Sequence, residues 1–282
     1  MLQPPPLEGS ASVLVGNQLF IVGGMIVTES SLPQPTEPTN QVWMYDTAAK
    51  SWERWTDFPI GICHHQVVAI DNNQILILGG EKDCAASRHM DLYKCSTLKN
   101  ADGSLPSWTL IQAAIGAATA MPQARAFHTA STIHVRLDTI VFMYGGKSVD
   151  NEILGDVWYL SLDDYAWSRL PSSISLDPGP RIGCSSAVIG ECVYIFGGQD
   201  RDDRLRSDLW RYNTFDRLWH LCYDDSIGAL EHAAGSLTRS NSQPIVPEGR
   251  MSYSMCSDLG NIWVFGASTK QIPSCVICGV SP

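Results

Sequence analysis

The sequence lacks the features that mark a secreted or membrane-embedded protein. Its first residues, MLQPPPLEGSA, contain neither the basic segment nor the apolar segment of a signal peptide, and no apolar run is long enough to cross a bilayer. It also contains no Asn-x-Ser/Thr sequon, although asparagine occurs in several polar stretches. We therefore expect a cytoplasmic protein, with the nucleus as the alternative compartment.

Positive charge is scarce as well. The 282 residues include 19 lysines and arginines against 29 acidic residues, which gives a formal net charge of -10. Nucleic acids and anionic membranes attract positive surfaces, so neither is expected as the main partner. The nine cysteines are an odd number in a chain too long to need disulfide staples, and this favours a reducing environment.

Familiar catalytic and metal motifs are missing too. There is no Gly-x-Ser-x-Gly sequence and no phosphate-cradling glycine loop. Cys275 and Cys278 form a CxxC pair, but no second pair stands nearby, so we interpret it as fortuitous. In a strand, the neighbouring side chains of His64 and His65 would point to opposite faces. One of the two occupies the same position of the repeat as His128, where a structural role is expected. We expect no cofactor and no bound metal.

What the sequence does contain is a repeat. An apolar run ends in a double glycine four times, with a degenerate fifth copy, at intervals of 52 to 69 residues: Gly23-Gly24, Gly79-Gly80, Gly145-Gly146, Gly197-Gly198 and Gly266-Ala267. An apolar run without alternation is typical of a strand buried on both faces. Glycine suits the position after such a strand if the backbone there needs a positive φ or must lie close to another backbone segment.

A tryptophan provides the second landmark of each repeat. It stands seven residues after an anchor residue in three repeats: Tyr45 to Trp52, Leu160 to Trp167, and Tyr212 to Trp219. The second repeat carries an insertion, so that Trp108 follows Cys95 by thirteen residues. Seven-residue spacing across a short turn predicts a hairpin whose last strand carries the tryptophan.

This pattern resembles the kelch repeat family, in which an arginine and often a histidine also open each repeat. The resemblance covers roughly residues 12–267 and implies an all-β propeller. Four full four-stranded blades are expected at 11–56, 62–111, 125–171 and 181–223, with an incomplete fifth at 250–267. In the third blade, strands are predicted at 128–133, 139–144, 157–160 and 167–170.

Several segments do not fit the repeat. Residues 1–10 are proline-rich, and the tail 268–282 shows neither a third-strand anchor nor a closing tryptophan. We therefore expect one of three arrangements: a truncated product, a ring completed by self-association through open blade edges, or a five-bladed ring finished by the tail. Residues 110–122 are predicted as a surface loop or short helix, and 226–247 as a long loop with a helix over 228–234.

Charged residues after the double glycines are the candidate binding residues. Because strands alternate in direction, the loops after the double glycines and the segments joining blades should open on one face. The candidates on this face are Glu81, Asp83, Arg88, Lys147, Asp150, Asn151, Asp200, Arg201, Asp203 and Arg204. The opening arginines Arg125, Arg181 and Arg250 are predicted to ring a central channel; alternatively, they bond carbonyls of neighbouring blades.

The sequence thus predicts a non-catalytic scaffold or adaptor that binds a protein partner through this loop face. The alternative is a metal-dependent or carbohydrate-acting enzyme, because the resemblance includes galactose oxidase-like and nitrile-specifier proteins. Their tyrosine–histidine copper set and Glu-x3-Asp-x3-His iron spacing are not found here. A third alternative is a truncated product without function.

Overall fold

The computed structural model describes residues 2–28, 37–82, 87–115, 121–170, 176–224, 228–229, 249–252, 254–258, 261–266 and 276–279. None of these residues lies in a helix. Accordingly, no helix of the length and apolarity that spans a membrane occurs in the described part of the chain. The chain divides into two compact units. The first comprises residues 1–128, 148–152 and 160–168, and the second comprises 129–147, 153–159 and 169–282.

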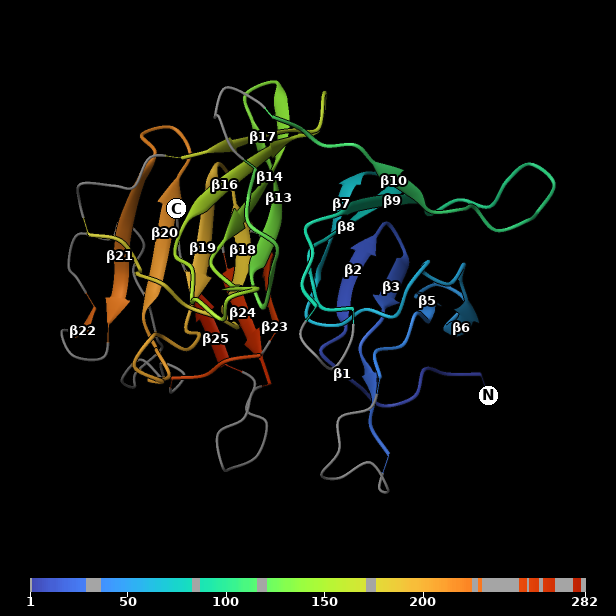
Figure 1. Cartoon of the computed structure of the whole chain (residues 1–282), viewed down its shortest axis with the longest axis horizontal. Helices are drawn as coiled ribbons and strands as arrows, with labels where there is room; N and C mark the ends of the chain where they lie inside the picture. Colours follow the sequence, from blue (N-terminus) through green and yellow to red (C-terminus); the bar gives the residue numbers. More distant parts are fainter. Residues whose placement is uncertain are drawn as a thin grey trace. The chain divides into compact units, whose positions relative to one another are not determined.

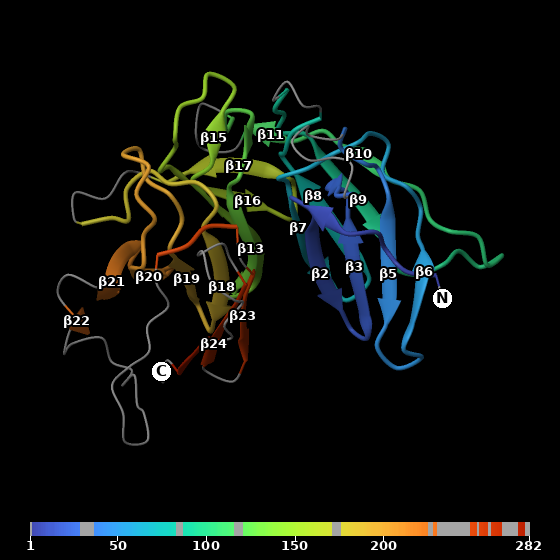
Figure 2. The same ribbon diagram turned by 90° about the horizontal axis from the view of Figure 1, so that it is seen from below.

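The first unit contains two four-stranded antiparallel sheets, seen as adjacent arrows in Figures 1 and 2. The strands of the first sheet, in spatial order, are β2 (Ala11–Val15), β3 (Gln18–Val22), β5 (Val42–Asp46) and β6 (Ser51–Arg54). Those of the second are β7 (Gln66–Asp71), β8 (Gln74–Leu78), β9 (Leu92–Ser96) and β10 (Thr109–Ile111). A short ribbon pairs β1 (Leu7–Glu8) with β4 (Met25–Ile26). Each sheet is one blade.

The third blade begins in the second unit with β13 (Thr129–Val135) and β14 (Asp138–Tyr144) and continues with β16 (Val157–Ser161) and β17 (Ala166–Arg169). The fourth contains β18 (Ser185–Ile189), β19 (Cys192–Phe196), β20 (Leu209–Asn213) and β21 (Leu218–Asp224). Two further short strands are β12 (Arg125–Ala126) and β15 (Lys147–Ser148). The predicted third-blade strands are confirmed to within two residues at each end.

The two insertions differ from their predictions. The segment 110–122 begins inside β10 and contains β11 (Ala114–Ile115), which pairs in parallel with β17. The predicted helix over 228–234 is wrong at its start, because β22 (Gly228–Ala229) extends the fourth sheet by pairing with β21. Residues 230–234 lie outside the described residues. In both places backbone hydrogen bonding to a neighbouring strand decides the conformation.

The fifth sheet has three described strands, β23 (Ser254–Asp258), β24 (Asn261–Phe265) and β25 (Val276–Gly279). The sequence of the tail shows no third-strand anchor, yet β25 lies in the tail and pairs antiparallel with β24 from Val276 to Gly279. The tail therefore adds a strand to the fifth sheet. Among the described residues the fifth blade remains one strand short of four. Self-association through such an open edge stays a prediction.

The apolar runs before the double glycines form the second strand of each blade, which lies in the interior of its sheet. Ile75, Leu76, Ile77 and Leu78 of β8 are all completely buried, so both faces of this strand are covered, as predicted. Each unit has its own apolar core. Phe20, Ile75 and Ile77 belong to one cluster in the first unit, and Phe142 and Ile195 to another in the second.

The seven-residue spacing corresponds to a cross-strand pair. Tyr45 of β5 lies opposite Trp52 of β6, with ring centroids 4.9 Å apart. Tyr212 of β20 lies opposite Trp219 of β21 at 5.0 Å. The predicted hairpins are therefore confirmed, and each aromatic pair ties the outermost strand to its neighbour.

The double glycines make the contact that joins consecutive blades. The backbone N–H of Gly80 donates to the carbonyl of Arg125, the first residue of the next opening motif, at 2.8 Å. Gly79 and Gly80 have φ angles of 63° and 106°, which side chains other than glycine rarely adopt. A Cβ on Gly79 would lie 2.6 Å from Cε1 of His128 and 2.9 Å from the carbonyl oxygen of Arg125. Glycine is required here both by conformation and by space.

We predict that Gly79→Ala lowers the free energy of unfolding by about 3 kcal/mol, because backbone strain and a steric clash add together. Gly190→Ala is the matched control: its φ is 58°, but nothing lies within 4 Å of the added methyl group. It should cost only about 1 kcal/mol. Urea denaturation measures both, and equal losses would show that the close approach is unimportant.

Candidate functional site

The segments that open the blades share a left-handed third residue. In the first unit these residues are His64 and Phe127, with φ of 53° and 59°, and Gly9 takes the same place at 66°. Their backbones are linked, since His64 N donates to Gly9 O at 2.8 Å and Phe127 N donates to His64 O at 3.0 Å. The imidazole of His64 also stacks on the ring of Phe127, with centroids 3.9 Å apart. These contacts hold His64 in a conformation unusual for histidine.

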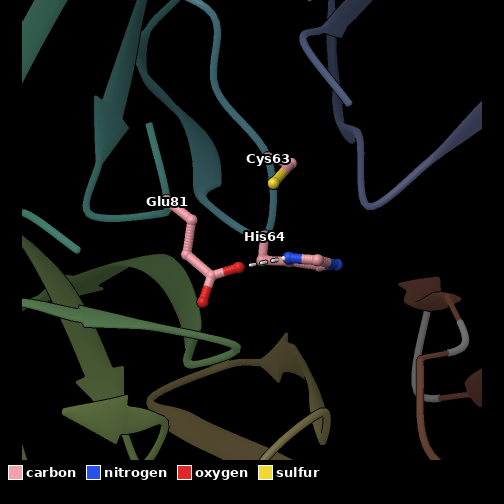
Figure 3. A group of neighbouring side chains, drawn as sticks. All are labelled: Cys63, His64 and Glu81. Atoms are coloured by element: carbon pink, nitrogen blue, oxygen red, sulfur yellow. Dashed lines mark hydrogen bonds and ion pairs between the residues drawn. The ribbon is translucent and has the colours of Figure 1, made fainter. Parts of the chain in front are cut away.

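The hairpin that follows Gly79-Gly80 lies beside this segment. Cys63 and Glu81 form an antiparallel bridge, with N–H···O distances of 3.0 Å and 2.9 Å in the two directions. Figure 3 shows that the side chains of Cys63, His64 and Glu81 converge. The left-handed backbone at His64 allows this, because in an ordinary strand the neighbouring Cys63 and His64 would point to opposite faces.

A polar network links the loop residues of the first unit. Nδ1 of His64 lies 2.9 Å from Oε2 of Glu81, and Nε of Arg88 donates to Oε1 of Glu81 at 3.0 Å. Arg88 also donates to the carbonyl oxygen of Ser148 and, at 3.2 Å, to Oδ1 of Asn151. Burial raises the pKa of Glu81, but hydrogen bonds and charge from His64 and Arg88 outweigh it, so that the pKa lies below its usual value. Glu81 is therefore ionised at neutral pH.

The first-unit candidates thus fall into two groups. Glu81 and Arg88 have side chains only 10% and 4% exposed, and they act within the network. Asp150 and Asn151 are exposed, at the tip of the hairpin after Gly145-Gly146. Asp83 lies outside the described residues.

In the second unit, Lys147 is half-buried. The hairpin after Gly197-Gly198 carries the other candidates. Its base is fixed by two hydrogen bonds between Gln199 and Ile182, at 3.0 Å and 2.9 Å. Oδ1 of Asp200 accepts the backbone N–H groups of Asp202 and Arg204, at 2.9 Å and 3.0 Å.

The outer side chains of this hairpin are accessible. Arg201, Asp203 and Arg204 are all exposed, and Arg201 donates through Nε and Nη2 to the carbonyl of Ile153, at 3.2 Å and 3.0 Å. Arg204 pairs loosely with Asp202 at 3.6 Å, with side chains 70% and 69% exposed. Asp200, half-buried, shapes the turn instead of facing outward.

The opening arginines require a correction. Arg125, Arg181 and Arg250 are only 0%, 1% and 5% exposed, so they do not line a surface that a partner can reach. Arg181 donates to the carbonyl of Gly197 at 2.9 Å, and Arg250 to that of Gly266 at 3.1 Å. The bonded glycine closes the second strand of the arginine's own blade, so these two hydrogen bonds are made within a blade. An arginine in sequence suggests a surface residue, but here it satisfies buried carbonyls.

Arg181 is also half of a buried ion pair. Its Nη1 and Nη2 lie 2.8 Å and 3.1 Å from the two carboxylate oxygens of Asp208, which is 3% exposed and also accepts from Nε1 of Trp210 at 2.7 Å. Burial alone would lower the pKa of Arg181 and raise that of Asp208. Their mutual hydrogen bonds and charges reverse both shifts, so both groups stay charged.

Three histidines of the first unit are buried and uncharged. Burial, aided by neighbouring positive groups, lowers the pKa of His65 to about 3, that of His128 to about 3 and that of His89 to about 4. A Cβ on Gly23 would lie 3.1 Å from Cε1 of His65, just as one on Gly79 would approach His128. His65 and His128 thus occupy equivalent places against the preceding double glycine, as the repeat predicted.

Sequence reasoning missed the proximity of Cys63, His64 and Glu81. Glu81 stands 17 residues from His64, and their side chains meet only because the bridge and the left-handed residue bring them together. No local pattern signals a positive φ at a histidine. The CxxC pair remains untested, since Cys275 lies outside the described residues and only the backbone of Cys278 is described.

In each of the four antiparallel blades the second strand ends at a double glycine and the outer hairpin carries a tryptophan. These features define a kelch-type β-propeller protein. The model of the KLHDC2/KLHL20/DRC7 Kelch-repeats domain matches residues 65–276, and the Kelch motif model matches residues 6–59. The chain belongs to the kelch-repeat family.

Curated relatives carry the same repeats. The chain is 24% identical over 228 residues to Kelch-like protein terF of Aspergillus terreus, covering 78% of this chain and 45% of that protein. It is 28% identical over 198 residues to Kelch domain-containing protein 10 of Rattus norvegicus, covering 70% and 44%. With bovine Kelch domain-containing protein 3 it shares 23% over 254 residues, covering 74% and 64%. The chain spans less than half the length of the first two relatives.

We predict that Asp208→Ala lowers the free energy of unfolding by about 3–5 kcal/mol, because it leaves the buried guanidinium of Arg181 without its counter-ion. Asp202→Ala removes an exposed partner of Arg204 and should cost under about 0.5 kcal/mol. Chemical denaturation of the two variants decides this. A small loss for Asp208→Ala would mean that Arg181 reaches solvent.

Stability should also fall between pH 7 and pH 5. The folded-state pKa values of His65, His89 and His128 lie below the unfolded value of 6.5, so their stabilising contribution is complete above pH 6.5 and is lost as the pH falls. Each should cost about 2 kcal/mol at pH 5. Urea titrations at both pH values test this. His65→Gln should reduce the difference by about 2 kcal/mol, and an undiminished difference in this variant would contradict the prediction.

Proposed function

We propose that this chain is a non-catalytic protein-binding module and that the short hairpins after the double glycines contact the partner. The observation that carries the proposal is a fixed backbone with accessible charged side chains. In the hairpin 199–205, the main chain is held by hydrogen bonds with the backbone of Ile182 and by N–H groups that donate to Oδ1 of Asp200, while Asp202 and Arg204 are about two-thirds exposed. Little backbone entropy is then lost on binding.

The kelch family assignment supports the same proposal. A propeller combines a rigid core with loops that vary independently of it, an arrangement suited to recognition. The tip carries both signs of charge, so the partner segment should also present both, and arginine can form charge-assisted hydrogen bonds with its carboxylates. The proposal includes a cytoplasmic site of action, consistent with the odd number of cysteines; a fluorescent fusion of the chain tests it.

The binding face can be tested by exchanging charges without changing the net charge. Asp202→Lys combined with Arg204→Glu reverses the tip of the blade-four hairpin. The matched control is Arg136→Glu with Asp138→Lys, at the exposed β13–β14 turn, which lies at the other end of its blade from Gly145. Partners of the wild-type chain are first identified by quantitative affinity purification, and binding of each purified partner is then measured.

The tip variant should weaken binding at least about tenfold, or about 1.4 kcal/mol, while the control stays within about twofold. All three proteins should melt alike, since only exposed side chains change. Equal binding by both variants would rule out this hairpin as the contact. Failure of the wild-type chain to enrich any protein would contradict the proposed function itself.

A further inference from the structure

Cys63, His64 and Glu81 bring together the three kinds of atom that bind zinc. Their ligand atoms, one sulfur, one imidazole nitrogen and one carboxylate oxygen, all lie within 4.8 Å of one another (Figure 3). Zinc in proteins uses thiolate, imidazole and carboxylate ligands, usually in a tetrahedral arrangement. Magnesium and calcium instead prefer oxygen ligands only, so the thiol and the imidazole select against them.

The three residues are held in place by contacts that need no metal. Cys63 and Glu81 are fixed by the two hydrogen bonds of their bridge, and His64 by its left-handed backbone and the stacked ring of Phe127. Cys63 is 2% exposed and carries a thiol, not a disulfide. The side chain of His64 is 17% exposed, which leaves a route to solvent.

Arg88 orients the carboxylate. It donates to Oε1 of Glu81 at 3.0 Å, whereas Oε2 faces His64 at 2.9 Å. In metal sites the oxygen that does not bind the ion is commonly hydrogen-bonded in this way, and the bond fixes the ligand. Arg88 is itself held by Ser148 and Asn151.

We propose that this chain binds one zinc ion through Sγ of Cys63, Nδ1 of His64 and Oε2 of Glu81, with water as the fourth ligand. Binding releases the thiol proton of Cys63 to solvent, and the ion replaces the hydrogen bond that Nδ1–H of His64 donates to Glu81. Nδ1 is thereby freed of its proton, and the neutral imidazole carries its proton on Nε2 instead. The thiolate and the carboxylate together balance the charge of the ion. Tetrahedral zinc sets its ligand atoms roughly 3.3–3.6 Å apart. Nδ1 and Oε2, 2.9 Å apart without the ion, must therefore separate slightly, and any ligand atoms nearer the 4.8 Å limit must approach; side-chain rotation can supply both changes.

The experiment titrates zinc chloride into the reduced, metal-free full chain by calorimetry. Cys275→Ser and Cys278→Ser are introduced throughout, because the CxxC pair of the tail is another source of thiolates. This background protein should bind one zinc ion per chain. Adding Cys63→Ser should weaken binding at least about 100-fold, whereas adding Cys95→Ser, another buried cysteine of the first unit, should not change it.

A spectroscopic arm separates ligation from a structural effect. Cobalt(II) added to the background protein should give a thiolate-to-metal charge-transfer band, which persists in Cys95→Ser and is lost in Cys63→Ser. Cys63→Ala, which keeps the site apolar and small, decides the matter if Cys63→Ser does not fold. Arg88→Gln should keep the stoichiometry and weaken zinc binding by about 10–100-fold. No zinc binding by the background protein, or unchanged binding after loss of Cys63, overturns the proposal.

Discussion

One backbone hydrogen bond recurs at each junction between blades, and the rest of the structure depends on it. The second glycine of each pair donates to the carbonyl of the residue that opens the next blade: Gly24 to Ile62, Gly80 to Arg125, Gly146 to Arg181 and Gly198 to Arg250, at 2.7–3.0 Å. At Gly23, Gly79 and Gly145, the first glycines of three pairs, an added Cβ would lie 2.3–2.9 Å from the same carbonyl oxygen, so no side chain fits there. This bond brings the opening segment against the hairpin that follows the glycines, so the candidate site in each unit is a consequence of blade packing.

Arginine and aspartate serve different purposes in the buried interior of the blades and at the exposed tips of the hairpins. In the buried interior, Arg181 and Asp208 are charged and paired with each other, so removing either partner would leave an uncompensated buried charge. At the tip of the hairpin 199–205, Arg204 and Asp202 form only a loose exposed pair and remain accessible to another molecule. The network of His64, Glu81 and Arg88 is intermediate in exposure, since it is largely buried but the side chain of His64 reaches solvent. Burial, and not residue type, separates structural charges from those that can bind.

Much of the fold could be predicted because its signals are local. Apolar runs, glycine pairs and cross-strand aromatic spacing lie within a few residues of one another, and the third-blade strands follow from them closely. β25 could not be predicted, because its short segment joins a sheet through pairing with β24 and shows no repeat signal of its own. The burial of Arg181 was equally unpredictable, since its counter-ion stands 27 residues further along the chain.

The sequence by itself therefore determined the class of fold, the repeat positions and the loops that carry charge, because each follows from periodicity and from the special conformations of glycine. Only the tertiary structure decided which charges are buried and which side chains meet. Cys63, His64 and Glu81 converge because a β-bridge joins Cys63 to Glu81 and because His64 adopts a positive φ. No local pattern of residues signals either condition.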